Sequence, residues 1–132
     1  SLAGFLPIAE MLVVTTPQPV AQTVAQRAAF MAEKVHLKVS GVIVNMSWFV
    51  GDDGVQYPIF GSGGGTELAE RLGVPLLAQV PLVPELRNGS DVGLPVAADP
   101  STEIGGVFAE MARVVDEDLR PTKRRHRELK II

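Results

Sequence analysis

The side chain best placed for chemistry in this sequence is an asparagine that follows an apolar run. Asn45 comes directly after Val39–Val44 and is followed by Met46 and Ser47. Its carboxamide offers both a hydrogen-bond donor and an acceptor, the pair needed to bind the edge of a purine. Asparagine is also a common turn residue, and spacing alone favours that simpler role. Both interpretations remain open at this point.

A glycine-rich segment, Gly61–Gly65, is the second candidate, because free N–H groups at a helix N-terminus attract phosphate. The segment has no Lys-Ser or Lys-Thr pair, which a Walker A loop requires. Thr66 also stands where a dinucleotide-binding fingerprint has its last glycine. We therefore expect a flexible loop and no phosphate site here.

No other residues have the spacing of a metal site or a catalytic centre. The chain has no cysteine, which excludes disulfides, thiolate ligands and a cysteine nucleophile. His36 and His126 fall in connecting or terminal segments, and Asp52-Asp53 is typical of a turn. The sequence thus predicts no catalytic residue and no metal ligand.

Three apolar runs predict the strands that must position Asn45. The run Val39–Val44 has four β-branched residues and no polar alternation, which is typical of a strand buried on both faces. Leu12–Thr15 and Leu76–Val80 are the other two. Such strands form parallel sheets flanked by helices, and ligands bind at their carboxyl ends. The predicted fold class is therefore α/β, with Asn45 at the carboxyl edge of the sheet.

Helical spacing predicts the elements that cover this sheet. The first helix is expected to follow Thr16 as its N-cap, with Pro17 and Pro19 in its first turn. Its core-facing stripe is expected at Val20, Val24, Ala28, Met31 and Val35, widened by Ala21, Ala25, Ala29 and Ala32. Further helices are expected at residues 66–72, 84–87 and 100–119, the last capped by Asp99. A hairpin is expected from runs 48–50 and 55–60, and a loop over 90–98.

Composition and charge indicate one globular domain with a basic end. The apolar share of 46% and the charged share of 20% are those of a soluble chain, and no basic leader or membrane-length apolar run is present. We therefore expect a cytoplasmic protein. Six of the 12 Lys and Arg fall in Arg120–Lys130 beside one acid, so that stretch carries +5 and the rest −8 of the net −3. We divide the chain into a domain, 1–120, and a solvated basic tail, 121–132, and expect no nucleic-acid or membrane partner.

Four segments taken together resemble the Mrp/ApbC family of P-loop ATPases, which are related to MinD and ParA and carry iron–sulfur clusters to target proteins. The segments are Val13–Gln18, Gly41–Ser47, Ile59–Gly64 and Val80–Arg87, in order within residues 1–95. The resemblance covers only the C-terminal half of that family's domain. The family's Walker A loop, switch region and Walker B strand lie upstream of the region that Ser1 matches. The resemblance thus implies that residues 1–120 form a partial, MinD/ParA-like P-loop NTPase domain.

The resemblance also implies cofactor-binding roles for residues at two strand ends: Asn45, Met46, Pro81, Leu82, Val83 and Arg87. Asn45 matches the family's adenine-contacting asparagine, with Met46 in the same motif. Pro81 and Leu82 match the segment on the other side of the base. Val83 stands where relatives usually have Asp, so the short helix that follows should lack a good N-cap. Arg87 matches a family arginine to which we assign no role.

The larger departure of the sequence from the family's pattern is in the predicted hairpin. Many members hold a shared cluster with a Cys-x-x-Cys pair between the Asn-Met-Ser and Phe-Gly motifs, and those two positions are Gly51 and Gly54 here. Iron–sulfur clusters are held by thiolates, which glycine lacks. We therefore expect ATP, with Mg in the complete domain, as the cofactor, and no cluster bound by this chain.

By resemblance, the chain supplies the adenine side of an ATPase that acts as a homodimer and delivers clusters to apo iron–sulfur proteins. Without a Walker A loop the chain alone should be inactive. Two alternatives stay open: a MinD/ParA-like positioning ATPase without a cluster role, and a non-catalytic interaction module that lacks the P-loop half.

Overall fold

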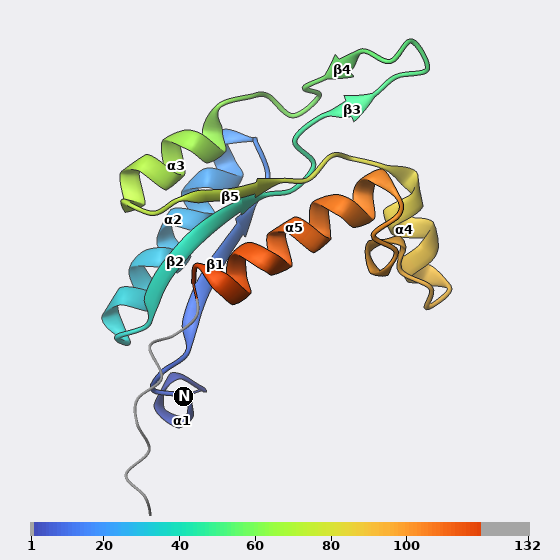
Figure 1. Cartoon of the computed structure of the whole chain (residues 1–132). Coiled ribbons are helices and arrows are strands. Elements are labelled where there is room, and N and C mark those ends of the chain that lie inside the picture. Colours follow the sequence, from blue (N-terminus) through green and yellow to red (C-terminus); the bar gives the residue numbers. More distant parts are fainter. Residues whose placement is uncertain (1, 120–132) are drawn as a thin grey trace, which may run out of the picture.

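A three-stranded parallel sheet forms the centre of the molecule. The computed structural model describes residues 2–119, with side chains from Gly4 onward. The strands are β1 (Glu10–Thr15), β2 (Lys38–Val44) and β5 (Leu76–Gln79), in the order β1-β2-β5. Helices α2 and α3 lie on one face of this sheet and α5 lies on the other (Figure 1). The predicted α/β class is confirmed.

The remaining elements follow the chain in the order α1 (Leu2–Phe5), α2 (Pro19–Lys34), β3 (Phe49–Val50), β4 (Gln56–Tyr57), α3 (Gly64–Leu72), α4 (Pro84–Asp91), a 3-10 turn (Val96–Ala98) and α5 (Glu103–Glu117). The crossovers β1-α2-β2 and β2-α3-β5 both step in the same direction across the sheet. Because parallel crossovers are right-handed, both helices must cover the same face. Strands β3 and β4 form the predicted hairpin, which projects from the carboxyl edge of the sheet (Figure 1).

Strand β2 is buried on both faces, as its sequence predicts. Val42 and Val44 pack with α2 and α3, whereas Ile43 packs with Val80 and the α5 residue Ile104. Successive side chains of a strand point to opposite faces, so β2 divides the interior into two clusters. It therefore sets the position of Asn45, the residue that follows it.

The predicted core stripe of α2 is correct only for three of the alanines expected to widen it, whereas the residues expected at its centre, Ala28 among them, are exposed. Val20, Val24, Met31 and Val35 are exposed, and the buried side chains are Ala25, Ala29 and Ala32. Both sets recur at helical spacing, so periodicity could not choose between them. The alanines are small and let the helix axis lie close to β1 and β2. The larger apolar side chains are left on the outside.

Two helix starts also differ from their predicted positions. Helix α2 begins at Pro19 after Gln18, and the Thr16 hydroxyl donates to the Gln18 side chain instead of capping the helix. Helix α5 begins at Glu103 with Thr102 as its N-cap, whose Oγ1 accepts from the Gly105 N–H at 3.0 Å. Asp99 cannot serve, because its Oδ1 accepts the N–H and the hydroxyl of Ser101.

Helix α4 is longer than predicted, and α3 begins two residues early at Gly64. The helix was predicted over 84–87, yet it continues through Asn88 and Gly89 to Asp91. The Ser90 hydroxyl donates to the Leu86 carbonyl at 2.7 Å, which supports this last turn. Gly89 is required there by close packing, since an added Cβ would lie 2.6 Å from the Leu94 carbonyl oxygen. The expected loop at 90–98 is therefore partly helical.

Strand β1 is at the edge of the sheet within residues 2–119. Val14 is 62% exposed there, beside a groove of about 470 Å³ whose lining includes Leu12, Val24 and Ala28. None of the helices in the described part of the chain is long and apolar enough to cross a membrane. Helix α5 ends at Glu117, two residues before its predicted end at 119. The predicted basic tail, 121–132, lies outside the described residues.

Candidate nucleotide site

Backbone hydrogen bonds join the ends of β2 and β5 side by side. The Val80 N–H donates to the Val44 carbonyl at 2.7 Å, and the Ser47 N–H donates back to the Val80 carbonyl at 3.0 Å. One step further, the Leu82 N–H donates to the Trp48 carbonyl at 2.7 Å. Residues 45–48 and 80–82 therefore form one continuous ladder at the carboxyl edge. Four of the six predicted site residues, Asn45, Met46, Pro81 and Leu82, lie in the two segments that this ladder joins.

Asn45 is half-buried and held on two sides. Its N–H donates to the Thr15 carbonyl at 2.7 Å, which ties it to the end of β1. Its Oδ1 accepts from the N–H of Met46 at 2.9 Å, and Met46 has a φ of 56° in the left-handed region. The side chain thus does close a turn, as the simpler interpretation has it. An amide oxygen accepts a second bond and Nδ2 donates two, so capacity for a purine edge is retained.

Pro81 and Val83 line an apolar cavity of about 520 Å³ between the base of the hairpin and the start of α5. Trp48, Ile104 and Val107 form other parts of its wall. This volume falls in the range typical of small-molecule sites. The other four predicted site residues do not line this cavity, so the six do not share a single preformed pocket.

Val83 and Arg87 belong to the start and the middle of α4. Val83 is the N-cap and makes no side-chain cap, as its sequence predicts, and Pro84 occupies the first helical position. Arg87 is exposed, and its guanidinium donates to Oδ1 of the neighbouring Asn88 at 2.9 and 3.3 Å. These bonds hold the Arg87 side chain against its own helix. A role for Arg87 in a nucleotide site stays a prediction.

The glycine-rich segment is required for close packing, which the sequence did not indicate. An added Cβ on Gly65 would overlap the Val44 side chain, and one on Gly64 would lie 2.9 Å from the Pro17 carbonyl oxygen. Gly61 and Gly63 have φ values of 94° and 81°, which favour glycine. These glycines let α3 start directly above β2, so the segment is a loop only as far as Gly63 and its last two glycines belong to the helix.

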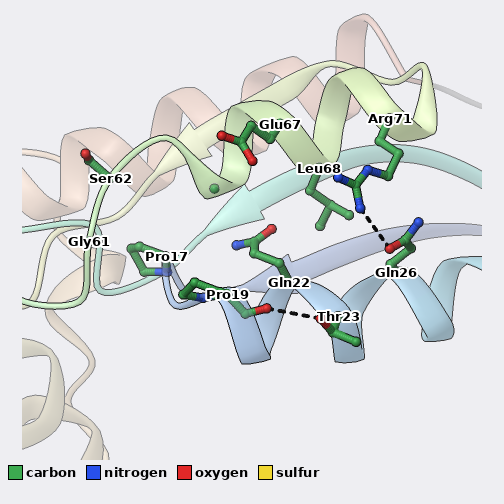
Figure 2. Close-up of a pocket in the computed structure, with 11 residues that line it drawn as sticks. Pro17, Pro19, Gln22, Thr23, Gln26, Gly61, Ser62, Glu67, Leu68 and Arg71 are labelled. Carbon is green, nitrogen blue, oxygen red and sulfur yellow. Dashed lines mark hydrogen bonds between the residues drawn. The ribbon is translucent and has the colours of Figure 1, made fainter.

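A polar pocket of about 370 Å³ between α2 and α3 was not predicted (Figure 2). Arg71 Nη1 donates to Gln26 Oε1 at 3.2 Å across its far end. Gln22 Nε2 donates to the Thr16 carbonyl at 2.6 Å, and Gln22 Oε1 is buried without a partner among the described residues. The spacing of Gln22 and Gln26 on one helix face was visible in the sequence. The opposing Arg71, 45 residues further on, was not.

The hairpin turn is closed by an aspartate. Asp53 Oδ1 accepts from the Val55 N–H at 3.0 Å, and the Tyr57 hydroxyl donates to Asp53 Oδ2. The bond from Tyr57, followed by that from Val55, lowers the pKa of Asp53 below its usual value. The same bond raises the pKa of the Tyr57 phenol. Asp53 therefore acts as an ionised acceptor at neutral pH.

The residues of this hairpin do not fit an iron–sulfur cluster. A Cβ added to Gly51 would lie 2.7 Å from Asp53 Oδ1 and 2.8 Å from Tyr57 Cε2, and Gly54 has a φ of 75°. A side chain is thus sterically disfavoured at one position and strained at the other. Residues 2–119 also contain no group of three His, Cys, Asp or Glu side chains able to hold a metal ion.

The arrangement of sheet and helices defines a P-loop NTPase fold of the MinD type. MinD from Pyrococcus horikoshii, solved with Mg-ADP, superposes on this chain with a TM-score of 0.63 at 25% sequence identity. The match covers 87% of this chain and 44% of the MinD chain. The cell division ATPase MinD from Pyrococcus furiosus matches 81% of this chain and 42% of its own, with a TM-score of 0.62 at 24% identity.

A family model described as NUBPL iron-transfer P-loop NTPase, in the ParA group, matches residues 1–116, and the chain belongs to this family. The iron-sulfur cluster carrier protein of Mycobacterium leprae is 42% identical over 88% of the chain. That of Escherichia coli is 39% identical over 85%. The chain spans 31% of the length of each of these relatives. The resemblance to the Mrp/ApbC family is confirmed.

Proposed function

We propose that this chain supplies the adenine side of the nucleotide site in a P-loop ATPase of the iron–sulfur cluster carrier type. The observation that carries the proposal is the backbone ladder that brings Asn45 and Met46 beside Pro81 and Leu82 at the carboxyl edge of the sheet. In open α/β sheets this edge is where ligands bind. The Mg-ADP in the related MinD structure supports a nucleotide as the ligand.

The base would be bound by the Asn45 carboxamide on one side and by Pro81 and Leu82 on the other. Asn45 can donate through Nδ2 to a ring nitrogen while Oδ1 accepts from an exocyclic amine. Its position is fixed by the bonds to Thr15 and Met46, which reduces the entropy lost on binding. Phosphate and Mg contacts would come from a Walker A loop outside these residues, next to the open edge of β1.

Replacing Asn45 with Ala in the full-length protein tests the proposal. The base edge would then be desolvated without a partner, so ATP binding should weaken by roughly 1–3 kcal/mol, about 5- to 150-fold in Kd. Binding of inorganic triphosphate, which has no base, should change little. Titration calorimetry with both ligands gives the comparison.

Gln26→Ala is the matched control, because Gln26 is also an amide but bonds Arg71 between α2 and α3. It should leave both affinities unchanged. Equal losses for ATP and triphosphate in Asn45→Ala would show that Asn45 acts only as a turn residue and would refute an adenine contact.

A positioning ATPase without a cluster role is the second candidate. It is favoured by the MinD-like fold together with the hairpin whose glycines exclude thiolate ligands. Cluster transfer from the full-length protein to an apo iron–sulfur protein separates the two. Transfer supports the carrier, whereas ATP hydrolysis with no transfer supports the positioning role. Homodimer formation and a cytoplasmic location remain predictions for either function.

A further inference from the structure

The β3–β4 hairpin is closed by its own hydrogen bonds. The Gly54 N–H donates to the Gly51 carbonyl at 2.9 Å, and the Gly51 N–H donates to the Val55 carbonyl at 3.0 Å. The Asp53 carboxylate adds the bonds from the Val55 N–H and the Tyr57 hydroxyl. A turn of seven residues thus has four internal bonds, and none of them involves a metal or a disulfide.

The Asp53 carboxylate occupies the space that a side chain at position 51 would need. The shortest distance from an added Gly51 Cβ is to Asp53 Oδ1, and the next is to the Tyr57 ring. A side chain at position 51 would require the Asp53 carboxylate and the Tyr57 ring, the two partners of the closing bond, to shift from their present places. At position 54 the positive φ disfavours any Cβ although the surrounding space is open. We therefore expect that a hairpin with cysteines at positions 51 and 54 could not keep this closed turn.

The closed turn presents apolar side chains on a projecting arm. Val50, Val55 and Ile59 are 43%, 50% and 57% exposed, and the hairpin extends away from the sheet (Figure 1). Tyr57 pairs with Phe49 across the two strands, and Asp53 accepts from it within the turn.

We propose that the β3–β4 hairpin is a metal-independent arm, held in its closed form by Asp53, in which the closed form and a cysteine-ligated cluster exclude one another. Asp53 is a positioning residue for this arm. The proposal is independent of the adenine site, because no residue of that site takes part in the turn.

Amide hydrogen exchange in the full-length protein tests the arm. The N–H groups of Gly51, Gly54 and Val55 should exchange at the same slow rates in EDTA and after anaerobic treatment with ferrous iron and sulfide. Asp53→Ala should speed exchange of the Val55 N–H about tenfold, since its acceptor is lost. Asp53→Asn keeps an acceptor oxygen and should restore most of the protection.

Asp52→Ala is the matched control, because Asp52 is an exposed acid one residue away. It should leave the three hairpin rates unchanged, and the amides of β2 should stay protected in every variant. The paired substitution of Gly51→Cys with Gly54→Cys should lose hairpin protection.

Two results would overturn the proposal. One is hairpin protection in the wild type that develops only with iron and sulfide. The other is a Gly51→Cys, Gly54→Cys variant that gains a stoichiometric visible absorbance while keeping wild-type exchange rates in the hairpin.

Discussion

At the scale of single residues, the Asp53–Tyr57 hydrogen bond ties the hairpin to pH. The pKa of Asp53 is lowered in the folded chain, so its contribution is present above the usual Asp pKa and is lost as pH falls through the lowered value. The pKa of Tyr57 is raised, so its contribution is present below the usual Tyr pKa and is lost as pH rises through the raised value. The closed turn should therefore be complete across the neutral range.

Tyr57→Phe removes the larger cause of the Asp53 shift and should return the pKa of Asp53 most of the way to its usual value. The Val55 N–H still donates to Asp53, so a smaller lowering should remain. Carboxyl chemical shifts followed by NMR through an acid titration measure the Asp53 pKa in the wild type and in Tyr57→Phe. An unchanged Asp53 pKa in Tyr57→Phe would contradict a hydrogen bond from the phenol.

Single site residues could be located from the sequence only where they belong to a motif. Asn45 and Pro81 follow apolar strands, so their place at the carboxyl edge could be predicted. The hydrogen bond from the Met46 N–H to Asn45 Oδ1 depends on the left-handed φ of Met46, which no sequence pattern indicates. The packing roles of Gly64 and Gly65 depend on how closely α3 approaches β2, a distance that only the folded chain sets.

At the scale of elements, strand positions could be predicted well and helix ends could not. Strands β1 and β2 are rich in β-branched residues, a local property that tertiary packing did not override. The N-cap of α5 required a choice between Asp99 and Thr102, both good caps. The choice depends on Asp99 already accepting from Ser101, a bond formed outside the helix.

Thr102→Ala should reduce the free energy of unfolding by about 1 kcal/mol, because the Gly105 N–H loses its acceptor. Urea denaturation of the full-length protein, followed by a spectroscopic probe in β2 or α5, measures the change in the free energy of unfolding. Thr66→Ala on the exposed side of α3 is the matched control and should have little effect. A larger loss in Asp99→Ala than in Thr102→Ala would restore Asp99 as the cap.

At the scale of the whole molecule, the open edge of β1 is the main departure from a closed domain within residues 2–119. An apolar edge strand offers unpaired N–H and C=O groups to another chain. Val14 is exposed on this strand, with no charge or proline beside it, and the apolar face of α2 flanks it. In the family this chain belongs to, the strand that feeds the Walker A loop is expected here.

The isolated 132-residue chain should therefore self-associate, or bind a separately made N-terminal piece of the domain. Light scattering coupled to size exclusion, over a concentration series, should show a mass that rises with concentration. Val14→Lys places a charge on the edge and should shift the chain toward monomer.

Val92→Lys is the matched control, since Val92 is 71% exposed after α4 and away from β1. It should leave the association unchanged. A monomer at every concentration with cooperative unfolding would mean that the chain closes its own sheet and that the domain begins elsewhere than we infer.

In helix α2 the most hydrophobic side chains are not the buried ones, so hydropathy does not indicate which positions tolerate substitution. Ala29 is fully buried against the sheet while Val20 is 72% exposed on the opposite side. Enlarging an alanine would push the helix off the sheet, whereas trimming a valine removes only surface. A ranking of mutational tolerance by hydropathy would therefore fail along this helix, because Ala25, Ala29 and Ala32 are less tolerant of enlargement than the exposed valines are of truncation.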